Sequence, residues 1–310
     1  MKTIYDHTLR HVAPIHRLIR VSVRASSSLL LTLASGVTRF ELPRDDVAPY
    51  FRFALVSGHY QEEVVALYRS LLRPGMIVVD VGAHAGYHTL RFARLVRPTG
   101  RVIAFEPSPA TFSALRRNIV RRRLSNVTLE QKAVTCGTGK APLYYSYSSL
   151  GHSIVPSLAS GEHTLVDCVS LDRYCEAIGI NNVNLIKINA EGAEVDVLSG
   201  MQSLLQRSAD PWVIAEFSPK YLKAAGYPPS RLIDFLLGLG FQIYEIGKNG
   251  VLTPLEAYGR VDSFISSVVK LTKLFARKQV PHRVQDAASG KSERAANDGQ
   301  SIWEASRQAS

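Results

Sequence analysis

The chain has 310 residues, enough for one large α/β domain with accessory ends but too few for two such domains. Hydrophobic residues make up 46% and charged residues 20%, the balance of a globular protein, and no run approaches the ~20 apolar residues that span a bilayer. The net charge of +11 permits nucleic acid, anionic lipid or acidic glycan as a partner and selects none of them.

The first 50 residues form a basic accessory region. Four of its arginines fall on one side of a possible helix, which would allow a weak peripheral membrane contact. The apolar side is narrow, which favours a solvated helix packed on the domain. The apolar run 29–34 follows a stretch too long and too charged for a secretion signal, and three cysteines match neither a disulfide framework nor a zinc pattern. We therefore expect a cytoplasmic protein.

From about residue 60, helix-like and strand-like segments alternate. Apolar positions at helical spacing predict helices, and short continuous apolar runs predict strands buried on both faces of a sheet. In chain order, the expected elements are helix 61–72, strand 76–80, helix 88–96, strand 101–105, helix 109–124, strand 127–133, strand 184–188, helix 193–205, strand 212–217, helix 230–239 and strand 241–246. This alternation predicts an α/β fold with a doubly wound, mostly parallel sheet in residues 51–280, followed by a disordered polar tail, 281–310.

The strongest site pattern is a strand that turns into a helix, Val78-Val-Asp-Val-Gly-Ala-His-Ala-Gly-Tyr-His-Thr89. Gly82 and Gly86 let the backbone turn sharply and let a ligand approach. A dinucleotide fingerprint would carry a glycine where this loop has His84, so the loop suits a nucleoside without a pyrophosphate. A G-x-x-x-x-G-K-[ST] loop for nucleoside triphosphates does not occur in the sequence.

Glu106 closes the second strand of the predicted sheet. A carboxylate at this place can accept hydrogen bonds from both ribose hydroxyls of a nucleoside. A glutamate at a strand end is common on protein surfaces and is weak evidence alone. Together with the loop that begins at Asp80, it favours nucleoside binding.

A third group of polar residues ends the strand 184–188. Lys187, Asn189 and Glu191 should reach the same sheet edge as Asp80, and Glu216 joins them from the next strand. Ionisable groups that meet at one edge are typical of an active site. Glu194 is expected only to favour the positive end of its helix, whereas for Glu191 and Glu216 a catalytic and a structural role both remain open.

Several of these segments together resemble one family, the FkbM methyltransferases, over roughly residues 58–247. The matching segments are Asp80-Val-Gly-Ala-His-Ala-Gly-Tyr87, Ala104-Phe-Glu-Pro107, Asn126-Val127, Ile186-Lys-Ile-Asn-Ala-Glu-Gly-Ala-Glu194 and Val197-Leu-Ser-Gly200. The glycine loop is shared by many methyltransferases, whereas the Lys-x-x-x-Glu-Gly-Ala-Glu block is far more specific.

The resemblance implies a Rossmann-like class I methyltransferase fold and S-adenosylmethionine as methyl donor, with no metal. It also implies O-methylation of a hydroxyl on a sugar, a glycan or glycolipid, or a natural product. The implied donor-binding residues are Asp80, Gly82, Ala83, Gly86, Glu106, Ala133 and Asn189. The candidates for the general base that takes the hydroxyl proton are Glu191, Glu216 and His152.

Two positions depart from the family pattern, and one candidate base has a plain alternative. The family usually has aspartate at Asn189 and asparagine at His84. An amide cannot take a proton at neutral pH, so a donor-binding protein that has lost catalysis is an alternative function. His152 lies in a loop where family members carry substrate-facing residues, and a histidine pKa suits a base, but it can equally be an exposed loop residue.

The run 116–123 carries five arginines and invites a nucleic-acid interpretation. Phe112, Leu115 and Ile119 mark the buried side of that helix, which leaves the arginines on a solvated face. We therefore expect a small-molecule or glycan acceptor and no nucleic acid. An RNA methyltransferase remains the alternative that the positive charge supports, although the sequence contains no recognisable RNA-binding module.

Overall fold

A computed structural model of the chain describes residues 40–43, 54, 60–146, 148–158 and 161–278. Most of the basic accessory region and the polar tail lie outside the described residues, so the expectations for both remain untested. Within the described part, no helix is long and apolar enough to cross a bilayer.

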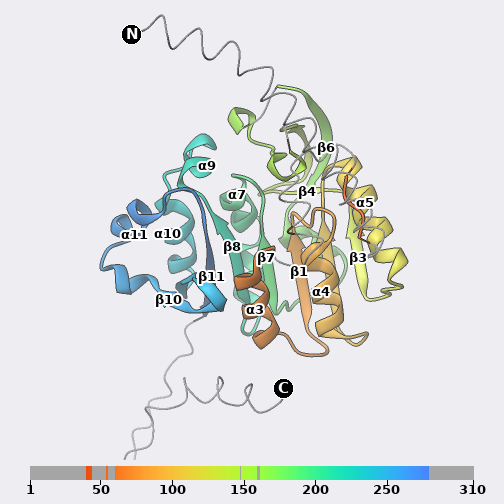
Figure 1. Ribbon diagram of the computed structural model, residues 1–310, viewed down its shortest axis with the longest axis horizontal. Coiled ribbons are helices and arrows are strands. Elements are labelled where there is room, and N and C mark those ends of the chain that lie inside the picture. Colours follow the sequence, from red (N-terminus) through yellow and green to blue (C-terminus); the bar gives the residue numbers. More distant parts are fainter. Residues whose placement is uncertain (1–39, 44–53, 55–59, 147, 159–160, 279–310) are drawn as a thin grey trace, which may run out of the picture. The chain divides into compact units, whose positions relative to one another are not determined.

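The described part contains an eight-stranded sheet in the order β10-β9-β11-β8-β7-β1-β2-β3 (Figure 1). Its strands are β1 (Ile77–Val81), β2 (Arg101–Phe105), β3 (Val127–Glu130), β7 (Leu185–Ile188), β8 (Trp212–Phe217), β9 (Phe241–Ile246), β10 (Leu252–Pro254) and β11 (Thr272–Lys278). The five strands from β3 to β8 are parallel, and β11 runs antiparallel between β8 and β9. The chain moves outward from β1 to β3 and then returns to the other side of β1. The predicted doubly wound, mostly parallel sheet is confirmed.

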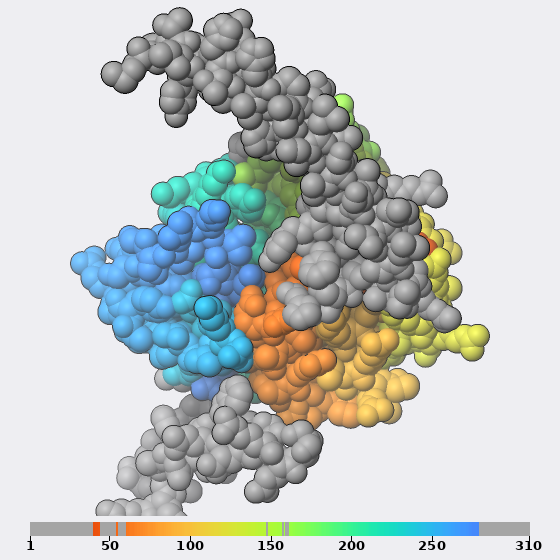
Figure 2. Space-filling model, viewed as in Figure 1, coloured from red at the N-terminus to blue at the C-terminus, as the bar shows by residue number. Residues whose placement is uncertain are grey.

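Helices cover both faces of this sheet because each central strand is apolar on both sides. In β1, Val78 packs with one hydrophobic core and Val79 with the other. The first core includes α3 (Glu62–Leu71), α4 (Tyr87–Val96) and α5 (Pro109–Arg121). The second includes α6 (Leu171–Ala177), α7 (Glu194–Ser199), α8 (Gln202–Arg207), α9 (Pro219–Ala224), α10 (Ser230–Gly238) and α11 (Val261–Ser267). Figure 2 shows the surface of α3 between the blue C-terminal elements and the paler orange surface of α4.

The predicted strand 127–133 is wrong in its extent. Only β3 belongs to the main sheet, where Lys132 and Tyr174 bind the carboxylate of Glu130 at the strand end. Ala133 then enters β4 (Ala133–Val134), which pairs with β6 (His163–Val169) in a second, three-stranded sheet. The remaining strand of that sheet is β5 (Gly139–Tyr144), which the sequence patterns did not predict.

The predicted helix 193–205 is also wrong, because the chain forms two shorter helices, α7 and α8. The break follows Gly200, whose carbonyl accepts the backbone N–H of Asp172 at 2.8 Å. The Asp172 carboxylate in turn accepts the N–H groups of Ser203 and Leu204 at 3.1 and 2.6 Å. Asp172, which is distant in sequence, therefore caps the start of α8, and the chain bends between the two helices.

The arginine-rich helix α5 ends at Arg121, three residues before the predicted end at Leu124. Leu115 and Ile119 are buried in the core as predicted, and Arg117 and Arg121 are exposed and form ion pairs with Glu41. The structure thus places these arginines on a solvated face.

Candidate functional site

The strand register brings four predicted site residues into one row at the carboxyl edge of the sheet. Val81 is paired with Phe105 of β2 and with Ile188 of β7, and Ile188 is paired with Ala215 of β8. The residues that follow these positions are Gly82, Glu106, Asn189 and Glu216. Strand order reverses at β1, where doubly wound sheets bind their ligands.

A hollow of about 640 Å³ opens beside this row. Several predicted site residues line it: Gly82, Glu106, Ala133, His152, Asn189 and Glu191. The other predicted residues are not part of its lining: Asp80, Ala83, Gly86 and Glu216.

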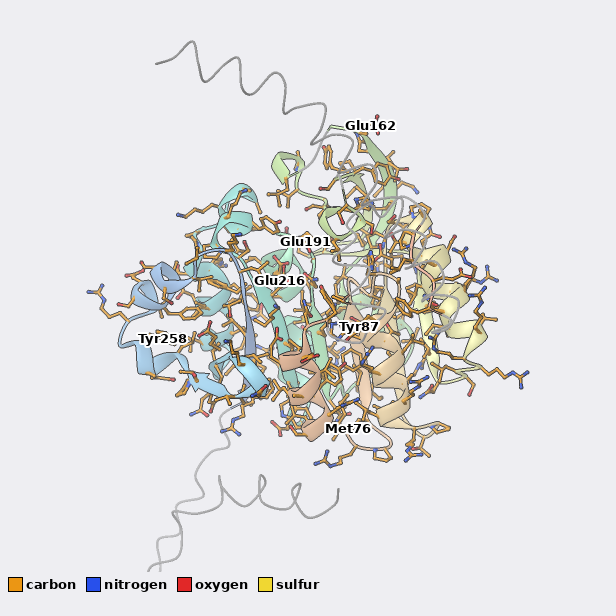
Figure 3. All side chains as sticks on the ribbon, in the orientation of Figure 1. Met76, Tyr87, Glu162, Glu191, Glu216 and Tyr258 are labelled. Atoms are coloured by element: carbon orange, nitrogen blue, oxygen red, sulfur yellow. The ribbon has the colours of Figure 1, made fainter. Side chains whose placement is uncertain are left out.

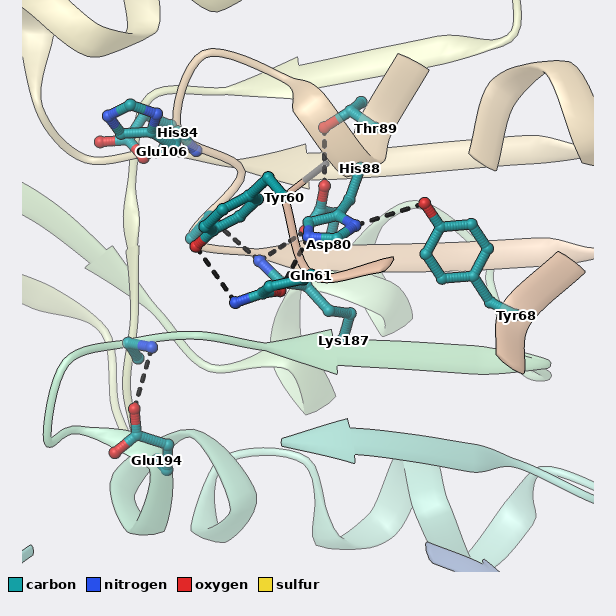
Figure 4. A network of polar contacts seen from close by, with 12 residues as sticks. Tyr60, Gln61, Tyr68, Asp80, His84, His88, Thr89, Glu106, Lys187 and Glu194 are labelled. Atoms are coloured by element: carbon teal, nitrogen blue, oxygen red, sulfur yellow. Dashed lines mark hydrogen bonds and ion pairs between the residues drawn. The ribbon is translucent and has the colours of Figure 1, made fainter. Parts of the chain in front are cut away.

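Asp80 is fully buried and does not line the hollow. Figure 4 shows its carboxylate beside Thr89. Thr89 Oγ1 donates to Asp80 Oδ2 at 2.6 Å. Lys187 is the register partner of Asp80 on β7, and its Nζ lies 3.2 Å from Asp80 Oδ1. The same Nζ donates to the carbonyl of Gly82 at 3.0 Å. Asp80 and Lys187 therefore hold the glycine loop from below.

The glycine loop passes so close to β7 that one position accepts no side chain. A Cβ on Gly82 would stand 1.9 Å from the Asn189 carbonyl oxygen, and Gly82 also has a φ of +71°. Gly86 has a φ of +91° and lies against Leu115, while the N–H groups of Gly82 and Ala83 both donate to the carbonyl of Phe105. Gly82 shapes the hollow directly, and Ala83 and Gly86 support the turn behind it.

Glu106 is 7% exposed, and its carboxylate bridges two segments. The backbone N–H of His84 donates to Oε2 at 2.9 Å, and that of Ser108 donates to Oε1 at 3.0 Å. Burial raises the pKa of Glu106 to about 7, although both N–H groups oppose the shift. Each oxygen keeps a second lone pair with which to accept a further hydrogen bond.

Two histidines line the hollow on the side of the second sheet. His84 Nε2 lies 2.7 Å from Ser149 Oγ, and burial lowers the pKa of His84 to about 3. The backbone N–H of Ser146 donates to His152 Nδ1 at 3.1 Å. In a neutral ring this bond leaves the proton on Nε2, so His152 is in the wrong tautomer to take a proton there.

Three glutamates gather at the ends of β7 and β8, and Figure 3 shows two of them, Glu191 and Glu216, close together. The Glu194 carboxylate accepts the N–H groups of Ala190 and Gly192, each at 3.0 Å, and so caps the turn before its own helix. Burial, followed by the charges of Glu216 and Glu194, raises the pKa of Glu191 well above its usual range. Burial likewise raises the pKa of Glu216, against the charges of Lys273 and Lys187.

Among the residues that the structure describes, no three acidic, histidine or cysteine side chains are arranged to hold a metal ion.

Comparison with known proteins decides the family. The sequence model of the Methyltransferase FkbM domain matches residues 80–243, more than half of the chain. The chain belongs to this family.

Curated proteins similar to this FkbM-family chain include three methyltransferases. "Methyltransferase 1" of Beauveria bassiana is 31% identical over 148 residues, 40% of this chain and 57% of its own length. "31-O-demethyl-FK506 methyltransferase FkbM" of Streptomyces tacrolimicus is 32% identical over 161 residues, 42% and 61% of the two chains. "Hexuronic acid methyltransferase AglP" of Haloferax volcanii is 26% identical over 210 residues, 64% and 79%. The chain therefore spans about three fifths of the length of the first two relatives.

The structure adds residues to this FkbM-family site that sequence reasoning missed. Lys132 and Ser149 line the hollow, and Tyr60 and Tyr221 lie near the two glutamates Glu191 and Glu216. Lys132 immediately precedes Ala133, a predicted donor-binding residue near the end of the predicted strand 127–133, and this neighbourhood was a usable signal. Tyr60 carried none, because it precedes the first predicted strand and is distant in sequence from both glutamates, whereas Tyr221 lies only five residues after Glu216, on the helix that follows β8.

Proposed function

We propose that this chain is an S-adenosylmethionine-dependent O-methyltransferase whose acceptor is a hydroxyl of a sugar, a glycan or glycolipid, or a natural product. The observation that carries the proposal is the row Gly82, Glu106, Asn189 and Glu216 beside a hollow at the carboxyl edge of the sheet, in a chain of the FkbM family. The names of the Streptomyces and Haloferax relatives support transfer to a hydroxyl or to a hexuronic acid, respectively.

The residues of the hollow fit the proposed donor. Glu106 would accept the ribose hydroxyls with its remaining lone pairs, and the backbone of Gly82, which lines the hollow, would face the nucleoside. The Asn189 amide oxygen is buried and accepts no hydrogen bond in the structure, so it would accept one from a bound ligand. When bound, the donor supplies an electrophilic methyl group on a sulfonium.

Glu191 is the base that the geometry favours. It lines the hollow, whereas Glu216 lies behind it and helps to raise its pKa. A base whose pKa lies near the working pH takes the hydroxyl proton most effectively. Most of the acceleration would come from holding the acceptor oxygen in line and close. His152 is the weaker candidate, because its Nδ1 already accepts the Ser146 N–H.

One alternative function rests on a specific observation. Asn189 stands where the family usually has aspartate, and its side chain cannot act as a base. A donor-binding protein without turnover would show donor binding and no methyl transfer, with partial recovery of transfer in Asn189→Asp.

The test uses S-adenosylmethionine with a labelled methyl group, the purified full chain and a fractionated cell extract. We expect label in the glycan, glycolipid or small-molecule fraction. Label in RNA would replace the proposed acceptor with the nucleic-acid alternative. Donor binding without label in any fraction would favour the binding protein, and absence of donor binding would overturn the whole proposal.

The matched variants are Glu106→Ala and, as a control, Glu256→Gln, which removes an exposed carboxylate outside the hollow. Glu106→Ala removes the charge-assisted hydrogen bonds to the donor, which contribute about 1.5–3 kcal/mol in total. We therefore expect calorimetry to show a donor affinity at least tenfold weaker for this variant. The control should bind like the wild type. Equal affinities of all three proteins would remove Glu106 from the donor site.

A further inference from the structure

Glu191, the base in the proposed function, stands in a backbone conformation that few residues other than glycine adopt. Its φ of +48° lies in the left-handed region, and Gly192 follows with a φ of +101°. A residue held in this region costs free energy, and it stays there only where the surrounding structure fixes it. The turn that carries Glu191 is therefore held by contacts with other parts of the chain.

Ser153 holds this turn by its carbonyl. The Ser153 Oγ donates to the Glu191 carbonyl oxygen at 2.6 Å and accepts the backbone N–H of Val155 at 3.0 Å. A hydroxyl has a single hydrogen, and here that hydrogen lies in the bond to the carbonyl. The bond fixes the peptide plane between Glu191 and Gly192, which the permissive backbone of glycine would otherwise allow to rotate.

The second sheet sets the position of Ser153. The residue is 1% exposed, its N–H donates to the Tyr144 carbonyl at 3.1 Å, and its carbonyl accepts the Tyr144 N–H at 2.8 Å. Four residues earlier, Ser149 Oγ lies 2.7 Å from Nε2 of His84 in the glycine loop. The segment is thus attached both to the end of β5 and to the glycine loop, and it presents the Ser153 hydroxyl from a fixed place.

The turn also packs directly against this segment. A Cβ on Gly192 would stand 3.0 Å from Leu158 Cδ1 and 3.4 Å from Val155 Cγ2. The N–H groups of the turn are bound by Glu194, which belongs to the helix that follows it. The contact from Ser153 therefore adds the second sheet to the elements that hold Glu191 at the hollow.

We propose that Ser153 is a positioning residue, which holds the turn in its left-handed conformation and so keeps the Glu191 carboxylate where it can take the proton of the acceptor hydroxyl. This inference rests on the proposed function and adds a residue to its machinery. A displacement of a reacting group by about 1 Å can lower a rate by a factor of the order of 100. The Ser153 hydroxyl is uncharged, so its contact with a backbone carbonyl persists whether Glu191 is protonated or ionised.

Ser208 provides a matched control outside the lining of the hollow. It is 2% exposed, its Oγ donates to the Leu204 carbonyl at 2.7 Å, and it accepts the Val183 N–H at 3.1 Å. Ser153→Ala and Ser208→Ala therefore remove the same two kinds of hydrogen bond from equally buried serines. Urea unfolding should show similar losses of stability in the two variants.

The first experiment measures label transfer from saturating S-adenosylmethionine into the fraction of the cell extract that the wild type labels. We expect Ser153→Ala to be at least about tenfold slower than the wild type and Ser208→Ala to stay within about twofold of it. Ser153→Thr, which keeps the hydroxyl, should be faster than Ser153→Ala. Donor affinity by calorimetry should be the same in all four proteins.

Two results would overturn this proposal. Equal rates in the two alanine variants would mean that the Ser153 hydroxyl contributes stability alone. Weaker donor binding in Ser153→Ala, in proportion to its lower rate, would place Ser153 in the donor site instead. Absence of label with the wild type would refute the proposed function and leave the position of Glu191 to the second experiment.

The second experiment follows the Glu191 carboxyl by carbon-13 NMR in donor-free protein, with Glu191→Gln to assign its signal. Without the donor, no sulfonium charge acts on the carboxyl. The ionisable groups that act on Glu191, or on which its charge acts, are Glu216, Glu194, Lys187, Tyr60 and Tyr221.

Burial and the neighbouring carboxylates raise the pKa of Glu191, against the charge of Lys187. If the turn relaxes in Ser153→Ala, the carboxyl becomes more solvated, and its pKa should fall toward the usual value of glutamate. In Ser208→Ala the titration should match that of the wild type. A Glu191 titration that is the same in Ser153→Ala as in the wild type would contradict the positioning role.

Discussion

At the scale of single residues, Gly82 is the position where the site depends most on the absence of a side chain. A Cβ there would stand 1.9 Å from the Asn189 carbonyl oxygen, which belongs to the neighbouring strand end and cannot move independently. The left-handed backbone alone costs a non-glycine residue about 1–2 kcal/mol, and the clash with the Asn189 carbonyl adds to this cost. Gly82→Ala should therefore destabilise the fold by several kcal/mol in total. Urea unfolding measures the loss.

Gly179 offers a control with the same backbone strain. Its φ of +70° nearly equals the +71° of Gly82, but a Cβ on Gly179 would meet nothing within 4 Å. Gly179→Ala should lose only the conformational term, about 1–2 kcal/mol. If the two variants lost equal stability, the close contact between the loop and β7 would be wrong.

At the scale of elements, the parts of the fold that could be predicted are those with a local signal. Strands β8 and β9 have the predicted bounds, because Trp212–Phe217 is a mostly apolar segment between Pro211 and Ser218, and Phe241–Ile246 is a segment rich in large apolar residues between Gly240 and Gly247. Strand β5 was missed, because Gly139 and Pro142 argue against a strand and only pairing with β6 overrides them. The insertion of β11 between β8 and β9 is set by contacts distant in sequence.

The same distinction applies to the site. The sheet edge could be predicted from strand ends, which is why Glu106, Asn189 and Glu191 were found together at the hollow. Which side chains point into the hollow depends on partners from elsewhere. Asp80 lies outside the lining of the hollow because Thr89 and Lys187 bind its carboxylate there, and no local sequence pattern predicts these two contacts.

The ion pair between Asp80 and Lys187 joins β1 to β7, and we expect the stability of the protein to depend on it. The two side chains are 0% and 6% exposed, so Lys187→Met would leave a carboxylate buried without its counter-charge. We expect a loss of about 3–5 kcal/mol in the free energy of unfolding. The double variant Lys187→Met with Asp80→Asn should recover part of it, since the remaining side chains are uncharged.

An exposed pair on the same molecule provides the comparison. Lys140 and Asp167 lie 2.7 Å apart, with side chains 65% and 58% exposed. Water screens such a pair, so Lys140→Met should change the free energy of unfolding only slightly. A loss in Lys187→Met no larger than this would show that the buried pair contributes little to holding the loop.

At the scale of the whole molecule, acidic and basic side chains gather in different places. The chain carries a net charge of +11, yet its site edge collects Asp80, Glu106, Glu191, Glu194 and Glu216. Arginines such as Arg116 and Arg117 of α5 lie on the exposed surface. Net charge therefore describes the exterior and gives no guide to the charge at the site, so by itself it does not favour an RNA acceptor.

The burial of these carboxyls makes the free energy of unfolding depend on pH. Burial raises the pKa of Glu194 from 4.5 to about 7. Between these values the native state keeps a proton that the unfolded chain releases, so the unfolding free energy falls as pH rises. A shift of this size corresponds to about 3 kcal/mol. His84 acts in the opposite direction below pH 6.5, because burial lowers its pKa to about 3.

Comparing the wild type with Glu194→Gln isolates one carboxyl from these opposing contributions. Glutamine cannot titrate, so the stability of the wild type relative to the variant should decrease by about 2–3 kcal/mol from pH 5 to pH 8. Urea unfolding at each pH gives the difference directly, and Glu162→Gln controls for the loss of one negative charge. The lost hydrogen bond to Ala190 or Gly192 shifts the variant by a constant amount and leaves the slope unaffected. Parallel profiles for wild type and Glu194→Gln would mean that Glu194 is not protonated in the native state, and the acidic edge would then be more strongly charged near pH 6 than its burial implies.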